Sequence, residues 1–231
     1  MPFLFILLLG LVFLFHDHQI DLFLMSMIFD ENNGFTYQNN FWLEKIFHKG
    51  GVLLVGAIGV GILSRMVYLF KNRQINKEKL LELGFLFCSV LISVIVIKFL
   101  KSITVLACPW NLEAFGGSRP FQPLWTLFSK DYRIGYCFPS GHASAGYSFF
   151  ALYFARALHH EPIKKNLLPG FFLGLIFGVT QQFRGAHFAS HDLATIMLCL
   201  WIPWVLSSII WLIRKSGGNY FSKIKRYIYK I

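Results

Sequence analysis

The chain has 231 residues, of which 55% are hydrophobic, 18% are aromatic and only 14% are charged. Soluble domains carry about 25% charged residues, so the composition excludes an ordinary soluble domain and indicates a membrane protein. The net charge of +11 does not indicate nucleic-acid binding, because the basic residues are spread over several short loops. In that arrangement they suit membrane topology and contact with anionic lipid headgroups.

Apolar runs about 17–25 residues long, separated by polar loops, predict an all-α membrane protein with six transmembrane helices in one bundle. In chain order, we expect spans at residues 2–15, 51–70, 80–100, 141–158 and 167–183, and a last one that ends near 213. The first run lacks a basic leader and a small-residue cleavage site, so we expect it to be retained as a helix. Residues 1–231 then form one integral-membrane domain.

The glycines of the second span predict close contact with a neighbouring helix, because small residues let helix backbones approach each other. They are Gly51, Gly56, Gly59 and Gly61.

The charges of the connecting segments predict the topology. The loops after the second and fourth spans and the tail 214–231 are basic, so the positive-inside rule places them and both chain ends in the cytoplasm. Segments 16–50, 101–140 and 184–190 then share the outer face. If the membrane is a bacterial inner membrane, as the short loops suggest, this face is periplasmic.

Segment 16–50 is polar but rich in aromatic residues. This mixture is typical of an interfacial segment that lies on the membrane surface. We interpret His16, Asp17 and His18 as polar residues that end the first span rather than as a metal site.

A polar turn before the fourth span has the features of an anion site. Pro139 sets the turn, and Ser140 is a good N-cap for a helix that starts at Gly141 or His142. The first turn of a helix presents unpaired N–H groups and a partial positive charge, and Gly141 lets a ligand approach that backbone closely. His142 would add a titratable proton beside the anion.

Reactive residues gather at the outer ends of the last four spans. They form three groups, which are Lys101 with Cys108 and Arg119, then Ser140, Gly141 and His142, and finally Arg184, His187, His191 and Asp192. Two histidines with several cations and no carboxylate cluster suit phosphoryl transfer. Cations stabilise charge on the phosphoryl oxygens, one histidine can attack, and the other can protonate the leaving oxygen.

These groups resemble the three motifs of the type 2 phosphatidic acid phosphatase superfamily of membrane lipid phosphatases. The family patterns are Lys-x6-Arg-Pro, Pro-Ser-Gly-His and Ser-Arg-x5-His-x3-Asp. The second motif is intact at residues 139–142. In the first, Lys101 is followed after six residues by Cys108-Pro109, and an Arg-Pro pair comes later at Arg119-Pro120.

The third motif is also altered. Residues 185–190 read Gly-Ala-His-Phe-Ala-Ser, similar to the family's Gly-x-His-x-x-Ser core. However, Gln181 stands at the position of the family Arg, and His191 stands at that of the family Asp, with Asp192 next to it. The resemblance covers roughly residues 80–213 and identifies the chain as a divergent branch.

The resemblance implies roles for single residues and a reaction without a metal or another cofactor. His187 would be the nucleophile that forms a phosphohistidine, and His142 would protonate the departing group. His191 or Asp192 would orient His187. His191 shares a helix face with His187, whereas a carboxylate is the better partner for a developing imidazolium. The phosphate would be held by Lys101, Arg119 and Arg184, with the Ser140 hydroxyl and the Gly141 backbone.

Three further questions stay open at the level of sequence. The spacing of His187 and His191 also fits zinc, with His142 as a third ligand, although no carboxylate or thiol obviously completes that site. Cys108 and Cys137 lie in the same outer segment, and we hypothesise that they form a disulfide in an oxidising compartment. The same residues would also serve a lipid-to-lipid phosphotransferase, or a lipid-binding or transport protein that has lost turnover.

Overall fold

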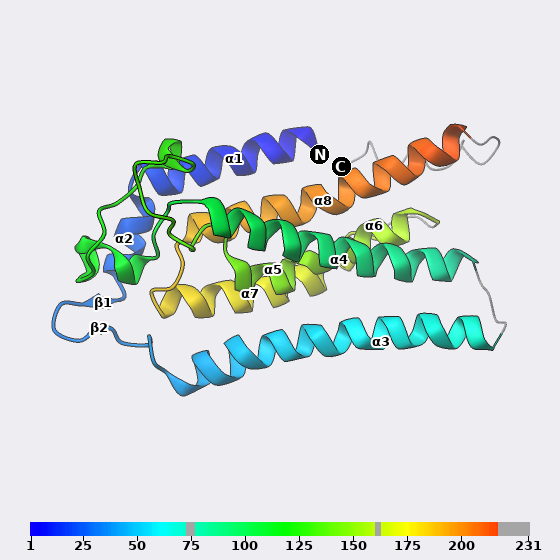
Figure 1. Cartoon of the computed structure of the whole chain (residues 1–231), viewed down its shortest axis with the longest axis horizontal. Helices are drawn as coiled ribbons and strands as arrows, with labels where there is room; N and C mark the ends of the chain where they lie inside the picture. Colours follow the sequence, from blue (N-terminus) through cyan, green and yellow to red (C-terminus); the bar gives the residue numbers. More distant parts are fainter. Residues whose placement is uncertain (73–76, 160–162, 217–231) are drawn as a thin grey trace.

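The structure, a computed structural model, describes residues 1–72, 77–159 and 163–216. Its helices run roughly along the longest dimension of the molecule (Figure 1). The bundle consists of α1 (Pro2–Asp17), α3 (Gly51–Lys71), α4 (Lys77–Ile103), α5 (Gly141–Tyr147), α6 (Ala151–Ala157), α7 (Leu168–Phe183) and α8 (Ala189–Ser216). All six predicted spans are therefore helical, and a 3-10 turn, η5 (Ser148–Phe150), joins α5 to α6 within the fourth.

Smaller elements gather mainly at one end of the bundle (Figure 1). They are α2 (Ile20–Ser26), the antiparallel pair β1 (Phe29–Asp30) and β2 (Gly34–Phe35), the π-helix η1 (Trp42–Gly50), and the 3-10 turns η2 (Pro109–Asn111), η3 (Glu113–Phe115) and η4 (Leu124–Thr126). A further 3-10 turn, η6 (Lys164–Leu167), leads into α7.

Within the described residues, three helical segments are long and apolar enough to cross a membrane. They are Leu53–Lys71, Lys77–Ile103 and Ala189–Lys215. The bent pair of α1 and α2, with 58° between the two helices, would be a fourth if it forms one span. The fold is thus that of a helical membrane protein with three or four membrane-length helices. The count of six stays a prediction, because α7 has only 16 residues and the 3-10 turn divides the fourth predicted span.

Helices α5 and α7 approach each other at a pair of glycines. A Cβ atom on Gly146 would lie 2.1 Å from the backbone nitrogen of Gly174, and one on Gly174 would lie 2.2 Å from the ring of Tyr147. No larger residue fits at either position without moving a helix. This contact fixes α5 against α7 and therefore fixes the start of α5 relative to the end of α7.

Only one of the four glycines of α3 has the predicted role. A Cβ atom on Gly51 would lie 2.7 Å from the ring of Phe177 on α7, whereas one on Gly56, Gly59 or Gly61 would meet nothing within 4 Å. The prediction of close helix contact is confirmed for Gly51 and wrong for the other three, which lie on a helix at the edge of the bundle (Figure 1).

Replacing Gly174 by alanine should destabilise the protein, because the new methyl group would overlap the ring of Tyr147. Overpacking of this kind costs about 1–3 kcal/mol. We expect a lower midpoint of thermal unfolding for the Gly174→Ala variant purified in detergent. The matched control is Gly59→Ala, which adds a methyl group in open space on a helix and should not lower the midpoint. Equal midpoints for the two variants would contradict the contact.

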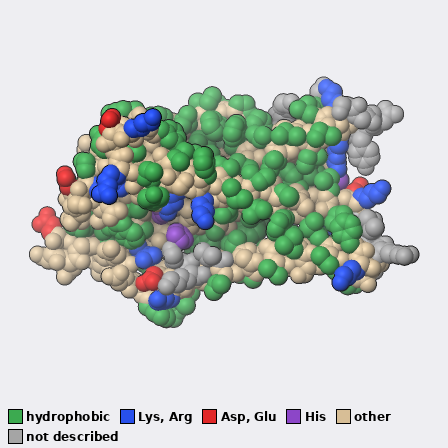
Figure 2. Space-filling model, viewed as in Figure 1, with side chains coloured by type: hydrophobic (Ala, Val, Ile, Leu, Met, Phe, Trp, Pro, Cys, Tyr) green, Lys and Arg blue, Asp and Glu red, His purple; other side chains and the backbone are tan. Residues whose placement is uncertain are grey.

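The two ends of the bundle differ in character. The end of α3, the start of α4, the end of α6 and the end of α8 lie at one end, and the segment 104–140 and the turn from α7 to α8 lie at the other (Figure 1). The surface between the ends is largely apolar, and histidine and basic side chains show in a hollow near the second end (Figure 2). Exposed apolar residues along the helices include Ile6, Leu53, Val60, Ile95 and Leu212.

Several basic residues of the predicted cytoplasmic loops and tail gather where α3, α6 and α8 end and α4 begins, at the end of the bundle opposite segment 104–140 (Figure 1). Lys79 and Arg156 both pair with Glu82 on α4, and Arg214 donates to the carbonyl of Leu158 just after α6. Residues 73–76 and 160–162 of the loops, and 217–231 of the predicted basic tail 214–231, lie outside the described residues.

The segment after α1 packs on the turn between α7 and α8. The ring of Phe35 lies 2.4 Å from the position that a Cβ on Gly185 would take, which requires glycine there together with its φ of +71°. The rings of Phe29, Phe35 and Phe115 also contact one another, with centroids 5.2–5.5 Å apart. Some of the aromatic residues that predicted a membrane-surface segment therefore form a small core over this turn.

Candidate active site

The end of α4 meets the start of α5. Lys101 lies in the last turn of α4, and its Nζ atom is 3.8 Å from the position that a Cβ on Gly141 would take. The cation of the first motif thus lies beside the backbone of the second motif. A positive charge next to a glycine at a helix start suits a bound phosphate group.

Ser140 occupies the N-cap position of α5 with an extended backbone, as predicted, but its side chain makes no capping hydrogen bond. Its backbone N–H donates to the carbonyl of His191 (3.3 Å), and its own carbonyl accepts from the Thr195 hydroxyl (3.1 Å). The start of α5 is therefore held against the first turns of α8. This contact brings the second and third motifs together.

His142 and His187 face each other across this junction. Their ring centroids are 6.5 Å apart, and the ring planes are inclined at 49°. His142 is half-buried, whereas His187 is buried. The second and third motifs therefore each bring one imidazole to this junction.

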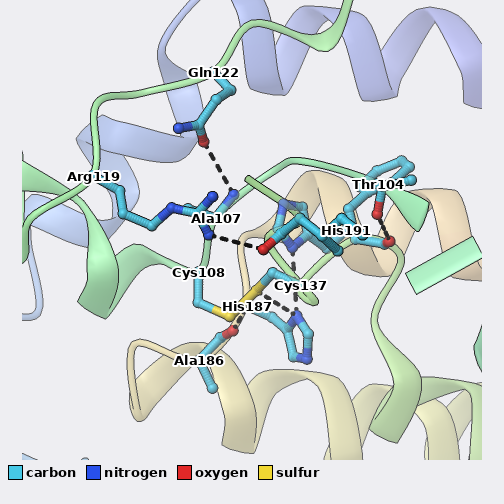
Figure 3. Close-up of a disulfide and its surroundings, with 11 residues drawn as sticks. Thr104, Ala107, Cys108, Arg119, Gln122, Cys137, Ala186, His187 and His191 are labelled. Atoms are coloured by element: carbon cyan, nitrogen blue, oxygen red, sulfur yellow. Dashed lines mark hydrogen bonds between the residues drawn. A yellow bond between two sulfur atoms is a disulfide. The ribbon is translucent and has the colours of Figure 1, made fainter. Parts of the chain in front are cut away.

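His191 lies directly behind His187. The two Nδ1 atoms are 3.4 Å apart, which is within hydrogen-bond distance (Figure 3). Because His191 lies in the first turn of α8, its position four residues after His187 places it on the same side of the chain. If His187 donates from Nδ1, its Nε2 atom keeps a free lone pair.

Cys108 and Cys137 are joined in a disulfide with a Cα–Cα distance of 5.2 Å (Figure 3). The sulfur of Cys137 lies 3.5 Å from Nδ1 of His187 and 3.0 Å from the carbonyl oxygen of Ala186. A disulfide sulfur carries no hydrogen, so these are packing contacts. The disulfide closes the loop before α5 and supports the loop that carries His187.

The surroundings of His187 keep its imidazole neutral. Burial lowers its pKa well below the ordinary value of 6.5, and the charges of Lys101, His191 and His142 lower it further, while a hydrogen bond to the backbone of Cys137 acts in the opposite direction. A neutral imidazole has the lone pair that a nucleophile needs.

This shift predicts the position of the acid limb of the pH–rate profile. For any reaction in which His187 attacks, kcat/KM should fall only well below pH 6.5, where the buried imidazole becomes protonated. Lys101→Met removes a charge that lowers this pKa, so the acid limb should move to higher pH in addition to any loss of rate. The comparison uses one substrate for both proteins, and an acid limb at the same pH in both would contradict the assignment.

Asp192 faces away from His187. Its Oδ2 atom accepts a 2.6 Å hydrogen bond from the amide of Gln182, and it lies 2.2 Å from the position that a Cβ on Gly178 would take. Asp192 is therefore packed against α7, and the hydroxyl of Ser140 lies beside it. Of the two candidates for orienting His187, the structure brings His191 to its ring and Asp192 to α7.

Arg119 and Arg184 have structural partners. The guanidinium of Arg119 donates to the carbonyls of Arg133 and Ile134 (the latter at 3.3 Å), at the edge of a polar loop cavity of about 630 Å³. Buried Arg184 donates from Nε to the carbonyl of Gln38 (2.9 Å). These contacts tie each arginine to a loop, whereas Lys101 lies at the histidines.

A metal is a further possibility for this cluster. Ligand atoms of Cys137, His187 and His191 lie within 4.8 Å of one another. A metal-binding cysteine must offer a thiolate, and the sulfur of Cys137 is in the disulfide. In this state the cluster offers two imidazoles, so the residues do not fit a complete three-ligand site.

The comparison with known families decides the relationship. The model of the PAP2 superfamily matches residues 82–215, which is more than half of the chain. The chain belongs to the PAP2 superfamily. Among curated proteins and among solved structures, no match to it was found.

The PAP2 match begins within α4 and contains the three motifs, so the helices α1 to α3 lie outside it. Gln181, at the position of the motif arginine in the superfamily, accepts a hydrogen bond from Nη1 of Arg184 (3.1 Å). A guanidinium from the next turn of the chain therefore reaches the side chain at this position.

Sequence reasoning missed two residues that lie at the PAP2 site, His16 and Asp21. His16 is not simply a polar residue at the end of a span, because its side chain is buried and lies 3.4 Å from that of Asp21 and 3.3 Å from the hydroxyl of Ser190 in the third motif. His16, Asp17 and His18 do lie at the end of α1, but the sequence did not indicate that His16 is buried beside Ser190. One feature of the sequence could have pointed to an acid here. His191 stands where the family motif has a carboxylate, which favours an acid from another outer segment near this motif.

Proposed function

We propose that this protein is a metal-independent membrane lipid phosphatase that works through a phosphohistidine on His187. Membership of the PAP2 superfamily supports phosphatase activity on a phosphorylated substrate. The apolar helices support a substrate embedded in the bilayer. The observation that carries the proposal is the arrangement of His142 and His187, 6.5 Å apart, with Lys101 beside the start of α5.

In the first half of the reaction, Nε2 of neutral His187 attacks the phosphorus atom. The P–N bond forms as the bond from phosphorus to the leaving oxygen breaks, and protonated His142 gives its proton to that oxygen. Lys101 and the first-turn amides of α5 stabilise the charge on the phosphoryl oxygens. The products of this half are the dephosphorylated lipid and phosphohistidine, with His142 neutral.

In the second half, water replaces the lipid. His142, now a base, takes a proton from water as its oxygen attacks the phosphorus, and the P–N bond breaks. Inorganic phosphate leaves, His187 becomes a neutral imidazole again, and His142 has regained its proton. The Nδ1–H group of His187 is held throughout by His191, which stabilises the charge that develops on the ring.

The proposed substrate is a phosphomonoester or pyrophosphate of an envelope lipid. Lipid A, undecaprenyl pyrophosphate, phosphatidylglycerophosphate and phosphatidic acid each combine an apolar tail with a phosphate at the membrane surface. The basic loops at the opposite end of the bundle support an active site on the outer face of the membrane, which is the periplasmic face of a bacterial inner membrane.

The test is a phosphate-release assay of the purified protein with these four lipids, with and without a chelator. We expect release from at least one lipid at a rate that the chelator does not change. A ³²P-labelled substrate quenched in base should leave an acid-labile label on His187. A rate that is lost with the chelator would contradict the metal-independent mechanism.

The products separate the related functions. Free phosphate indicates hydrolysis, and a newly phosphorylated lipid indicates transfer to a lipid hydroxyl. Binding of a lipid without either product would show a binding or transport protein and would overturn the proposal.

A further inference from the structure

We propose that an apolar groove between α3 and α4 holds a long hydrocarbon chain of the substrate while the phosphate lies at Lys101. This inference rests on the proposed function. It narrows the substrate class to lipids whose phosphate lies close to a chain that is long enough to enter the groove. Helix α3 lies outside residues 82–215, so the family match does not cover this part of the groove.

The groove lies between two of the membrane-length helices. Its volume is about 320 Å³, and every residue that lines it is apolar. On α3 it is lined by Gly56 and Gly59, where a Cβ atom would meet nothing within 4 Å. Val90 and Val94 line it on α4, and Phe149 of η5 contributes a third wall. The space therefore exists because α3 carries glycines where larger side chains would fill it.

The groove is open to the surroundings of the bundle. Val60, Leu63 and Leu91, which also line it, are exposed. Around membrane-spanning helices these surroundings are hydrocarbon chains. An empty apolar hollow loses the van der Waals contacts of its walls, and a water molecule would find no polar side chain in the lining. A hydrocarbon chain is therefore the occupant that fits the groove.

The groove and the proposed phosphate site share one face of α4. Phe87 and Val94 line the groove, and Lys101 follows Val94 at the same interval of seven residues, which keeps the three side chains on one side of the helix. At about 1.5 Å per residue, Val94 lies about 10 Å from Lys101 and Phe87 about 21 Å from it. A lipid with its phosphate at Lys101 can therefore extend a chain along α4 into the groove.

Two other elements give the same placement. Phe149 comes eight residues after Gly141, which lies beside Lys101, so it is roughly 12 Å along the chain of α5 and η5 from the phosphate site. The hollow that shows histidine and basic side chains lies near the end of α4 and the start of α3 (Figures 1 and 2). The site is thus open beside the two helices that form the groove.

The decisive variant is Gly59→Leu, whose new side chain would enter the groove. The open space at this position allows α3 to carry the larger residue. Hexadecylphosphonate, which has a long chain and is not hydrolysed, should bind at least about 10-fold more weakly to the variant, the effect of one methylene group in an apolar pocket. Isothermal titration in the same detergent should show an unchanged affinity for inorganic phosphate.

The matched control is Gly61→Leu. Gly61 lies two residues further along α3 and is equally open, but it is not among the residues that line the groove. This variant should keep both affinities. Equal weakening of hexadecylphosphonate in the two variants, or no weakening in either, would overturn the proposal. An equal loss of affinity for inorganic phosphate in Gly59→Leu would also overturn it, because α3 would then act on the phosphate site rather than on the chain.

Turnover gives a second readout. For the wild-type protein in mixed micelles, kcat/KM should be higher for hexadecyl phosphate than for butyl phosphate, whose chain is too short to reach Val94. Gly59→Leu should remove most of this difference, and Gly61→Leu should preserve it. If a second copy of the protein occupied the groove instead, Gly59→Leu would lower the mass of the protein in detergent without weakening hexadecylphosphonate, and the proposal would be wrong.

The two proposals can fail separately. Wild-type protein that binds hexadecylphosphonate more tightly than Gly59→Leu does, but releases no phosphate from any lipid, would refute the proposed function itself. Active wild-type protein with an unaffected Gly59→Leu variant would refute only the role of the groove.

Discussion

Replacing His187 by alanine should abolish phosphate release, with a loss of at least about 10⁴-fold in kcat, as expected when a covalent nucleophile is removed. The physical reason is that His187 is the imidazole proposed to attack the phosphorus, and its ring faces that of His142 at a centroid distance of 6.5 Å. The labelled phosphohistidine should disappear together with turnover. Substrate binding should persist, because Lys101 and the start of α5 remain in place.

Two measurements complete this prediction. The control is His18→Ala, which removes an exposed histidine at the end of α1 and should leave the rate unchanged. Isothermal titration with inorganic phosphate should give similar affinities for wild-type protein and for His187→Ala. Phosphate release that survives in His187→Ala would show that a different group attacks the phosphorus.

Replacing His142 by alanine should have an effect that depends on the leaving group. For a lipid alkoxide, which must be protonated as it leaves, we expect kcat to fall about 10²- to 10⁴-fold. For p-nitrophenyl phosphate, whose leaving group departs without a proton, formation of the phosphohistidine should be nearly unaffected. The enzyme intermediate should then accumulate, because the variant also lacks the base that activates water.

A burst experiment measures whether the phosphohistidine intermediate accumulates in the His142→Ala variant. With p-nitrophenyl phosphate, His142→Ala should release a burst of p-nitrophenol close to one equivalent, followed by slow turnover, while the wild-type protein shows a smaller burst. If both leaving groups were slowed by the same factor, His142 would be a phosphate-binding group rather than the acid.

The second and third motifs show what a local sequence pattern can and cannot predict about the site. The intact Pro-Ser-Gly-His turn marked the start of α5, and the spacing of His187 and His191 indicated a shared face. Whether Asp192 or His191 meets His187 was open in the sequence, because adjacent residues at the start of a helix point in directions that differ by about 100°. The structure answers this through Gly178, which leaves a place on α7 for the side chain of Asp192.

The three predicted phosphate-binding cations could not be distinguished by sequence spacing. Lys101, Arg119 and Arg184 were all predicted as phosphate ligands, because each is a basic residue near a motif. Only their three-dimensional partners distinguish them: Lys101 lies at Gly141, whereas the two arginines hold loop carbonyls. The use of a cation depends on what its long side chain meets, and sequence spacing does not contain that information.

The sequence by itself determined the membrane class, the approximate positions of the long helices, and the family to which the chain belongs. These properties follow from local composition, hydrophobic run length and short motifs. The tertiary structure decided which helices meet and which polar side chains are buried together. It placed close contact at Gly146 and Gly174, and it brought His16 and Asp21 to Ser190 and His191. Asp21 and Ser190 are 169 residues apart in sequence. Such contacts arise when whole helices pack together, so a local sequence pattern cannot predict them.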